Sequence, residues 1–365
     1  MKKIVLSVVM LAFFKAAFSQ GCIPIRNLVG FGQFAKPSQD PLTGEPTKWF
    51  LNITQRYFKA HDTYSGTEYV REPDWGIKTT RVYLINFGVT RVFDKGWAVA
   101  LDVPVLAGSR YAWRFEHVNP DSSKHTTHSF GLGDVRVTGF KWLWDVAGAT
   151  RGNIQVGLGL KLPTGRYDYS DYFYTNPQSN TEKKWAPVNS AIQPGDGGTG
   201  ITTEINAFYS LTRSIILYGN VFYLFNPRDV NGVSTTFGRD ATVNQIASTS
   251  NVYSVPDSYT FRAGANVAVR NFTIWGGLRM EGSPVHDVIG KSNGQRRAGK
   301  TVSIDPGINY KFRSVTLYTF IPIPIHRQTR QTVPDQRISD LTGSEVPSPG
   351  GFVNVQLFLG MMFKL

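Results

Sequence analysis

The chain has a single cysteine, Cys22, among its 365 residues. One cysteine cannot form an internal disulfide framework. We expect a free thiol, with lipid attachment or pairing with another chain as alternatives. After the N-terminal segment, no stretch of eighteen apolar residues occurs, so no helical membrane span is predicted. The mean hydropathy of −0.20 excludes a helical membrane protein, but it fits strands in which only alternate residues are apolar.

Residues 1–19 have the form of a secretory signal peptide. Two lysines follow Met1, an apolar run spans residues 4–14, and residues 17–19 (Ala-Phe-Ser) fit a cleavage site. Export is therefore expected, with Gln20 as the first mature residue. The formal net charge is +13, and removing the three lysines of residues 1–19 leaves +10 on the mature chain. In an exported protein this points to acidic lipid head groups or polysaccharide, and no nucleic acid is expected as a partner.

The segment 351–365 alternates strictly between two faces. One face is wholly apolar: Val353, Val355, Leu357, Leu359, Met361, Phe363 and Leu365. The other face is mixed and includes Asn354, Gln356 and Lys364. A strand of this kind crosses a bilayer if both of its edges are paired. A half-buried strand in a soluble sandwich has the same pattern, so this segment alone does not decide between the two.

Eleven further stretches alternate in the same way, and their connections decide the fold class. The stretches are 49–57, 79–92, 97–105, 133–144, 153–162, 201–209, 215–225, 259–269, 272–280, 302–312 and 315–325. Long polar connections, among them 61–76, 110–129 and 226–257, alternate with short turns. Outer-membrane barrels have short periplasmic turns and long outer loops. The sequence therefore predicts an all-β, closed antiparallel transmembrane barrel of about twelve strands over residues 47–365, located in the cell outer membrane.

Residues 20–46 contain several glycines and prolines and little alternation. We interpret them as an N-terminal periplasmic segment that either forms a partial plug in the lumen or lies across the rim. The expected partners are outer-membrane lipid and lipopolysaccharide, and the barrel-assembly machinery, which would engage the C-terminal strand.

Charged residues within the strands fall almost entirely on the inward row. A charge on the lipid-facing row costs a few kcal/mol near the bilayer midplane, so this one-sidedness orients the strands. Lys141 is the exception, and it points outward unless a bulge shifts the register. Two interpretations remain: a structural ion-pair core, or a polar pathway for small solutes. The candidate lumen-lining residues are Arg56, Asp102, Asp134, Arg136, Lys161, Glu204, Arg262, Arg279, Glu281, Asp305 and Lys311.

Other chemical motifs are weak. His125 and His128 lie in a predicted outer loop without further metal-binding residues nearby, so no metal site is expected. The loop 290–300 carries Lys291, Arg296, Arg297 and Lys300, and it is either a solvated loop or a contact for outer-leaflet phosphates. Twelve-stranded outer-membrane phospholipases require an outward-facing Ser and His. The outward rows carry almost none, so we expect no catalytic residues, no enzyme activity and no cofactor.

Three short motifs resemble a known protein group. They are Gly131-Leu132-Gly133-Asp134, the stretch from Gly157 to Gly165 (GLGLKLPTG), and the stretch from Tyr223 to Arg228 (YLFNPR). They are similar to outer-membrane proteins of the meta-cleavage pathway of phenol degradation, which are thought of as transporters. Gln20-Gly21-Cys22 is similar to the mature start of exported Bacteroidetes proteins. The resemblance implies a barrel that passes aromatic compounds.

The resulting hypothesis is an outer-membrane channel or passive transporter for small solutes. The alternative is a closed structural barrel whose long outer loops bind a surface partner or polysaccharide.

Overall fold

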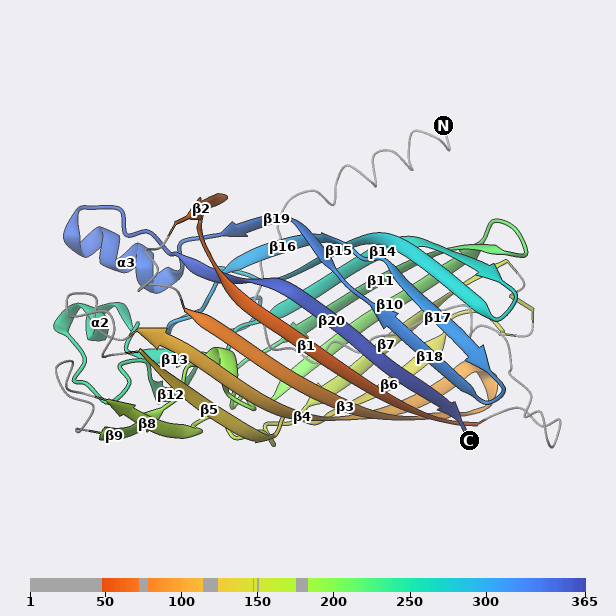
Figure 1. Cartoon of the computed structure of the whole chain (residues 1–365), viewed down its shortest axis with the longest axis horizontal. Coiled ribbons are helices and arrows are strands. Elements are labelled where there is room, and N and C mark those ends of the chain that lie inside the picture. The colour runs from red at the N-terminus through yellow and green to blue at the C-terminus, as the bar shows by residue number, and fades with distance from the viewer. Residues whose placement is uncertain (1–47, 72–77, 114–123, 147, 150, 175–182) are drawn as a thin grey trace.

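The computed structural model describes residues 48–365 except 72–77, 114–123, 147, 150 and 175–182. The predicted signal peptide (1–19) and N-terminal segment (20–46) lie outside the described residues. The described chain forms one antiparallel sheet that closes on itself as a barrel of twelve strands (Figure 1). The fold class predicted from the sequence is therefore confirmed.

Nine of the twelve barrel strands are continuous. They are β1 (Trp49–Ser65), β3 (Thr79–Val92), β4 (Trp97–Trp113), β7 (Gly152–Lys161), β10 (Gly200–Ser210), β11 (Ile215–Phe225), β14 (Ser258–Val269), β15 (Phe272–Ser283) and β20 (Gly350–Lys364). Each pairs with its sequence neighbour, and β20 pairs with β1 to close the ring. The pairing of β1 with β20 joins the first and last strands, so the sheet does not end in two free edges there.

Three barrel strands are interrupted and consist of two segments each. They are β5 (Lys124–Leu132) with β6 (Arg136–Trp142), β16 (Gly299–Ile304) with β17 (Gly307–Phe312), and β18 (Val315–Phe320) with β19 (Ile323–Thr329). Pro306 and Pro322 lie in two of the breaks. Proline lacks the N–H that a strand ladder needs. The predictions of continuous strands over 302–312 and 315–325 were therefore wrong at these points. The strand predicted over 133–144 starts inside the third break and is strand only over β6.

The two rows of each strand differ in exposure as predicted. On β7, the outward Leu158 is 65% exposed, whereas Lys161 on the inward row is 5% exposed. The same alternation runs along β3, where Tyr83 is exposed and Asn86 is buried. Exposed apolar side chains on a closed sheet are stable when lipid covers them. Lys141 remains on the outward row without a bulge, close to the short turn that precedes β4, where its Nζ contacts the backbone oxygen of Lys95.

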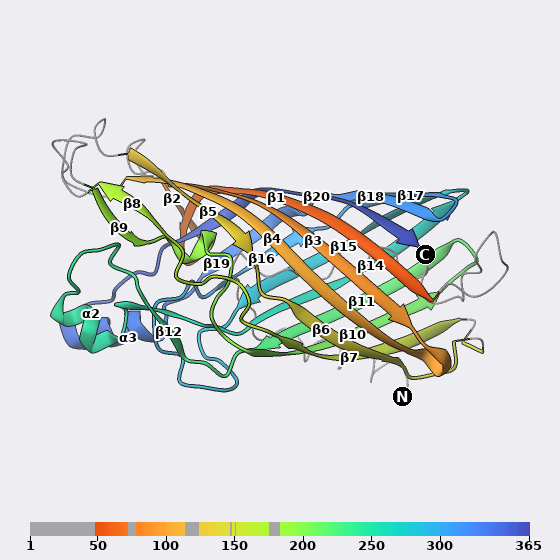
Figure 2. The same cartoon turned by 90° about the horizontal axis from the view of Figure 1, so that it is seen from below.

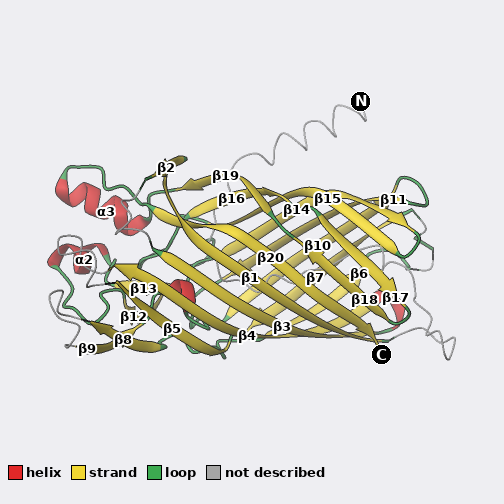
Figure 3. Ribbon diagram, viewed as in Figure 1, coloured by secondary structure: helices red, strands yellow, loops and turns green. Residues whose placement is uncertain are grey.

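The short turns and the C-terminus gather at one end of the barrel, and the additional elements gather at the other (Figures 1 and 2). At the short-turn end, η2 (Asp94–Gly96) connects β3 to β4. The long-loop end holds β2 (Glu68–Val70), β8 (Ser170–Tyr174), β9 (Lys183–Pro187), η3 (Ser190–Ile192), β12 (Val230–Ser234), α2 (Val243–Ser248), β13 (Val252–Ser254) and α3 (Val333–Thr342). The helices α2 and α3 lie farthest from the short turns (Figure 3).

Some predicted loops are in fact strand. The connection predicted over 61–76 begins with the end of β1, which continues to Ser65. The connection predicted over 110–129 contains the end of β4 and most of β5. These segments are strand because they pair with neighbouring strands, β1 with β2 and β4 with β5. Polar composition alone had suggested loops.

Large outward-facing aromatic residues ring the short-turn end. This set comprises Trp49, Phe93, Trp97, Trp144, Tyr209, Phe272 and Phe312, all more than 40% exposed. Arginine and lysine accompany them: the Arg91 guanidinium stacks over the rings of Trp49 and Phe93, and Lys141 over that of Trp97. Such aromatic girdles mark the membrane interface of barrels.

Candidate functional site

Buried ion pairs run along the inner wall of the barrel. Each joins side chains of opposite charge on the inward rows: Arg136 with Asp102 at 3.2 Å, Lys161 with Asp134 at 3.4 Å, Arg262 with Asp305 at 2.6 Å, and Arg279 with Glu281 at 2.7 Å. Eight of the eleven residues singled out from the sequence are therefore paired. Removing one partner of a buried pair costs about 3–5 kcal/mol, so loss of either partner would destabilise the wall.

The other three candidates have different surroundings. Glu204 accepts a hydrogen bond from Asn206 at 3.0 Å and belongs to an amide network with Asn220. Arg56 stacks against the rings of Phe58 and Phe358 at 5.1 and 5.4 Å. Lys311 has the inward parity, but it is exposed at the short-turn end and joins none of the ion pairs of the described residues.

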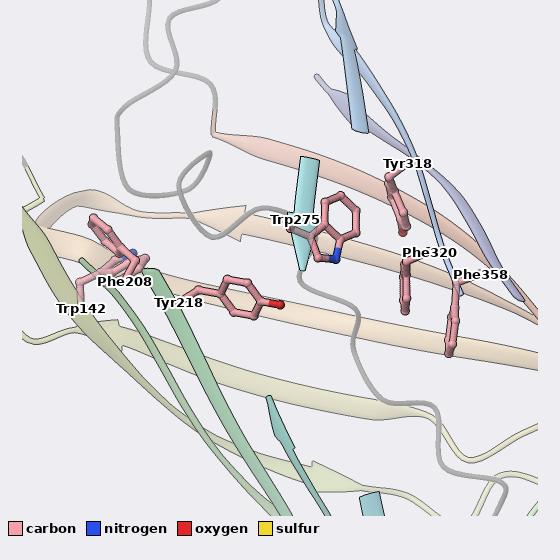
Figure 4. Packing of buried hydrophobic residues seen from close by; sticks show 7 residues of the cluster. All are labelled: Trp142, Phe208, Tyr218, Trp275, Tyr318, Phe320 and Phe358. Atoms are coloured by element: carbon pink, nitrogen blue, oxygen red, sulfur yellow. The ribbon is translucent and has the colours of Figure 1, made fainter. Parts of the chain in front are cut away.

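A cluster of aromatic side chains faces the interior, and the sequence reasoning missed it. Its buried members are Trp142, Phe208, Tyr218, Trp275, Tyr318, Phe320 and Phe358 (Figure 4). Phe320 and Phe358 stack at 4.2 Å between ring centroids. These rings alternate with the charged pairs, since Arg262 lies over Phe320 and Arg279 over Phe358. The interior is therefore polar and aromatic together. The inward parity of these rings is present in the sequence, but parity alone does not show that rings from different strands meet.

Four of the inward aromatic residues lie opposite glycines on the neighbouring strand. The directly paired positions are Phe140 with Gly157, Tyr218 with Gly264, Trp275 with Gly307, and Tyr318 with Gly360. A Cβ atom on any of these glycines would overlap the facing side chain. Because glycine has no Cβ, each aromatic side chain can lie flat on the wall, an arrangement that also protects the glycine backbone. Part of each ring therefore packs directly against the backbone of the neighbouring strand.

Several buried polar atoms between these rings have no protein hydrogen-bond partner among the described residues. They include Tyr218 Oη, Trp275 Nε1 and both amide atoms of Asn309. Trp275 and Asn309 lie on adjacent strands, and Tyr218 lies over Gly264 and Gly277 beside them. An unsatisfied buried polar group costs about 1–3 kcal/mol. Such groups in native proteins call for an explanation, such as water or a ligand.

The three motifs behind the family resemblance meet where the wall joins the long-loop end. The Asp134 carboxylate accepts hydrogen bonds from the backbone N–H groups of Gly165 and Asp196 at 3.0 and 3.2 Å. Lys161 contacts both Asp134 and Asp196. Arg228 donates to the carbonyl oxygen of Gly197. These motifs together hold the turn 194–198 against the ends of the strands.

The segment just before that turn packs into the barrel mouth. Val188 and Ile192 are buried in an apolar cluster with Phe58, Leu84 and other residues of β1, β3 and β4. Ser129 bonds with the backbone oxygen of Ile192. The predicted long polar loop therefore contains a short apolar insert that narrows the outer mouth.

The basic loop 290–300 does not present its charges together. Arg296 is buried and forms a two-pronged ion pair with Asp287 at 2.6 and 2.7 Å, and Arg297 donates to the side-chain oxygen of Asn189 at 3.0 Å. Nearby, burial raises the pKa of the Asp257 carboxyl, which accepts hydrogen bonds from the backbone of Asn226 and Val288. The outer-leaflet contact considered for this loop cannot involve the enclosed Arg296.

His125 and His128 lie in β5 rather than in the predicted loop. His128 points outward, and its nearest acidic group is Asp171 at 3.9 Å. Over the described residues, no group of three or more His, Cys, Asp or Glu side chains could hold a metal ion. In the same part of the chain, no helix has both the length and the hydrophobicity to cross a bilayer.

Comparison with known proteins gives a fold match. No family model and no curated protein matches the chain. A solved outer membrane channel from Pseudomonas putida F1 matches with a TM-score of 0.54 at 11% identity, over 87% of this chain and 96% of that one. The fold is that of an outer-membrane β-barrel. The translocator domain of the autotransporter NalP from Neisseria meningitidis gives a TM-score of 0.47 at 10% identity, over 89% and 91% of the two chains. At such identities the likeness concerns the fold alone, so membership of the phenol-degradation group stays a prediction.

Proposed function

We propose that the protein is a passive outer-membrane channel for small solutes, with aromatic compounds among them. The observation that carries the proposal is the inner wall itself, where polar atoms of Tyr218, Trp275 and Asn309 lie near a cluster of buried aromatic rings and have no hydrogen-bond partner among the described residues. A solute with a ring and a hydrogen-bonding group matches both features. The eleven residues predicted from the inward rows would line this path, most of them as paired and thus neutralised charges.

The pairing of charges leads to an expectation about selectivity. Inner-wall carboxylates and guanidinium groups neutralise one another, so a permeating ion would meet little net field. We expect weak preference between small anions and cations. Because Arg279 and Asp305 are fully buried, we also expect a small conductance with frequent closures rather than a wide water-filled pore.

Single-channel recording in planar bilayers tests the proposal. The purified protein should give discrete openings. In liposomes, uptake of a small hydroxylated aromatic compound should exceed that of a sugar of similar mass. Trp275→Ala should alter both measurements severalfold. Trp144→Ala is the matched control, because Trp144 is exposed on the outer wall.

A closed barrel with binding loops is the second candidate, and the burial of the ion pairs favours it. Complete absence of openings and of uptake, in protein shown to be folded, would select this candidate and reject the channel.

A further inference from the structure

The outer wall changes character in three successive rows toward the long-loop end of β1, β3, β4 and β5. These strands are in direct register, so each row runs across the wall. The first row is Gln55, Ile85, Val105 and Leu132; the second is Tyr57, Tyr83, Ala107 and Phe130; the third is Lys59, Arg81, Ser109 and His128. A mainly apolar row gives way to an aromatic row and then to a polar, basic one. Membrane proteins change in this order from the hydrocarbon core to the head groups.

Two cations face each other directly in the third row. Lys59 of β1 and Arg81 of β3 are register partners, and Cβ atoms in such pairs are about 4.5–5.5 Å apart. Like charges opposite one another destabilise a sheet. Neither residue belongs to an ion pair of the described chain. The carboxylate at the far end of this row, Asp171, is bonded to the backbone N–H of His128. An anion between Lys59 and Arg81 would turn their repulsion into two attractions.

The height of this pair matches a bilayer surface. At the opposite end of the same two strands, Trp49 and Arg91 are partners within the short-turn girdle. The ten residue steps from Trp49 to Lys59 span about 33 Å along a strand. At a tilt of about 40°, this is about 25 Å of height, the thickness of the apolar band of such barrels. With the short turns in the periplasm, Lys59 and Arg81 lie at the head groups of the outer leaflet.

We propose that Lys59 and Arg81 form a binding site for the phosphate of an outer-leaflet glycolipid of the lipid A class. The phosphate lies between the ammonium and guanidinium groups. The rings of Tyr57 and Tyr83, 4.8 Å apart between centroids, lie one row nearer the membrane centre and contact the apolar part of the same lipid. The site faces lipid rather than the lumen, so it does not depend on whether the barrel conducts.

Native mass spectrometry of the full-length protein in detergent, titrated with bisphosphorylated lipid A, tests this site. Each cation near a membrane phosphate contributes about fivefold in affinity. Lys59→Gln with Arg81→Gln should therefore weaken binding about 25-fold. The control removes two exposed charges from the short turns at the opposite end of the barrel, with Arg213→Gln and Arg270→Gln, and should change binding less than twofold. Lys59→Arg should retain it. Heat-modifiable migration on gels establishes that each variant is folded.

Two further measurements identify the ligand. Removing the phosphates from lipid A should weaken its binding to the wild type at least as much as the double substitution weakens binding of the phosphorylated lipid. Excess inorganic phosphate should not displace the lipid. The proposal is overturned if the folded double variant binds lipid A within twofold of the wild type, if removing the phosphates has no effect, or if inorganic phosphate competes fully.

Discussion

The ion pair between Arg262 and Asp305 offers a quantitative test of how the interior stabilises the barrel. Asp305 is completely buried and Arg262 nearly so, with Nη2 and Oδ2 2.6 Å apart. Asp305→Asn keeps the size of the side chain but removes its charge, so the buried guanidinium over the Phe320 ring loses its directly paired carboxylate. Breaking a buried pair in this way costs about 3–5 kcal/mol. The free energy of unfolding, measured by urea titration in lipid vesicles, should fall by that amount.

The exposed pair Arg166 and Asp168 provides the control. Its Nε and Oδ1 atoms are 3.1 Å apart, but both side chains are 59% exposed. Exposed pairs contribute at most about 1 kcal/mol, so Asp168→Asn should have a correspondingly small effect. Replacing both buried partners, with Arg262→Met and Asp305→Leu, should recover much of the loss, because no unpaired charge remains. A cost below about 1 kcal/mol for Asp305→Asn would refute the view that these charges form a dry, mutually dependent network.

Three other expectations follow from single contacts. Gly360→Val should push the Tyr318 ring off the wall and lower both stability and single-channel conductance. Gly276→Ala should be neutral, because no atom lies near that position. Equal behaviour of the two variants would contradict the flat-ring arrangement. Lys161→Met should leave two neighbouring carboxylates, Asp134 and Asp196, without their shared cation, and should increase protease cleavage near residue 195 relative to Lys184→Met. Burial raises the pKa of Asp257 above its usual 3.8, so the unfolded chain loses this proton at a lower pH than the folded protein does. The contribution of Asp257 to stability therefore falls as the pH rises between the two pKa values. The unfolding free energy of the wild type minus that of Asp257→Asn should decrease from about pH 4 toward neutrality, and a constant difference would exclude this effect.

Alternation and connection length were sufficient to predict the barrel. A strand has only two faces, so the apolar row of β7 and the polar row opposite it could be assigned from the sequence. The order of short and long connections then distinguished a barrel from a sandwich. Pro306 and Pro322, which lie in two of the strand breaks, are visible in the sequence. The apolar alternation continues across both prolines, so it predicted unbroken strands.

The sequence predicted the candidate site less completely. The alternation of residues along each strand placed Asp134 and Lys161 on the inner side of the wall. Which charged side chains form pairs depends on the register between strands, and the pattern within one strand does not contain that register. The turn 194–198 is more than thirty residues from Lys161 in sequence and reaches it through folding of the outer loops. The pairing of Tyr318 with Gly360 likewise joins two strands whose register the sequence does not specify.

Pairing is uneven around the wall. β1 and β20 are matched at fourteen positions, whereas β18 and β20 are matched at six, and that ladder ends at Phe320 beside the break at Pro322. Local opening is easiest where few backbone bonds hold two strands together. Amide hydrogens beside the proline break should therefore exchange with solvent early. Those at the junction between the first and last strands should exchange last.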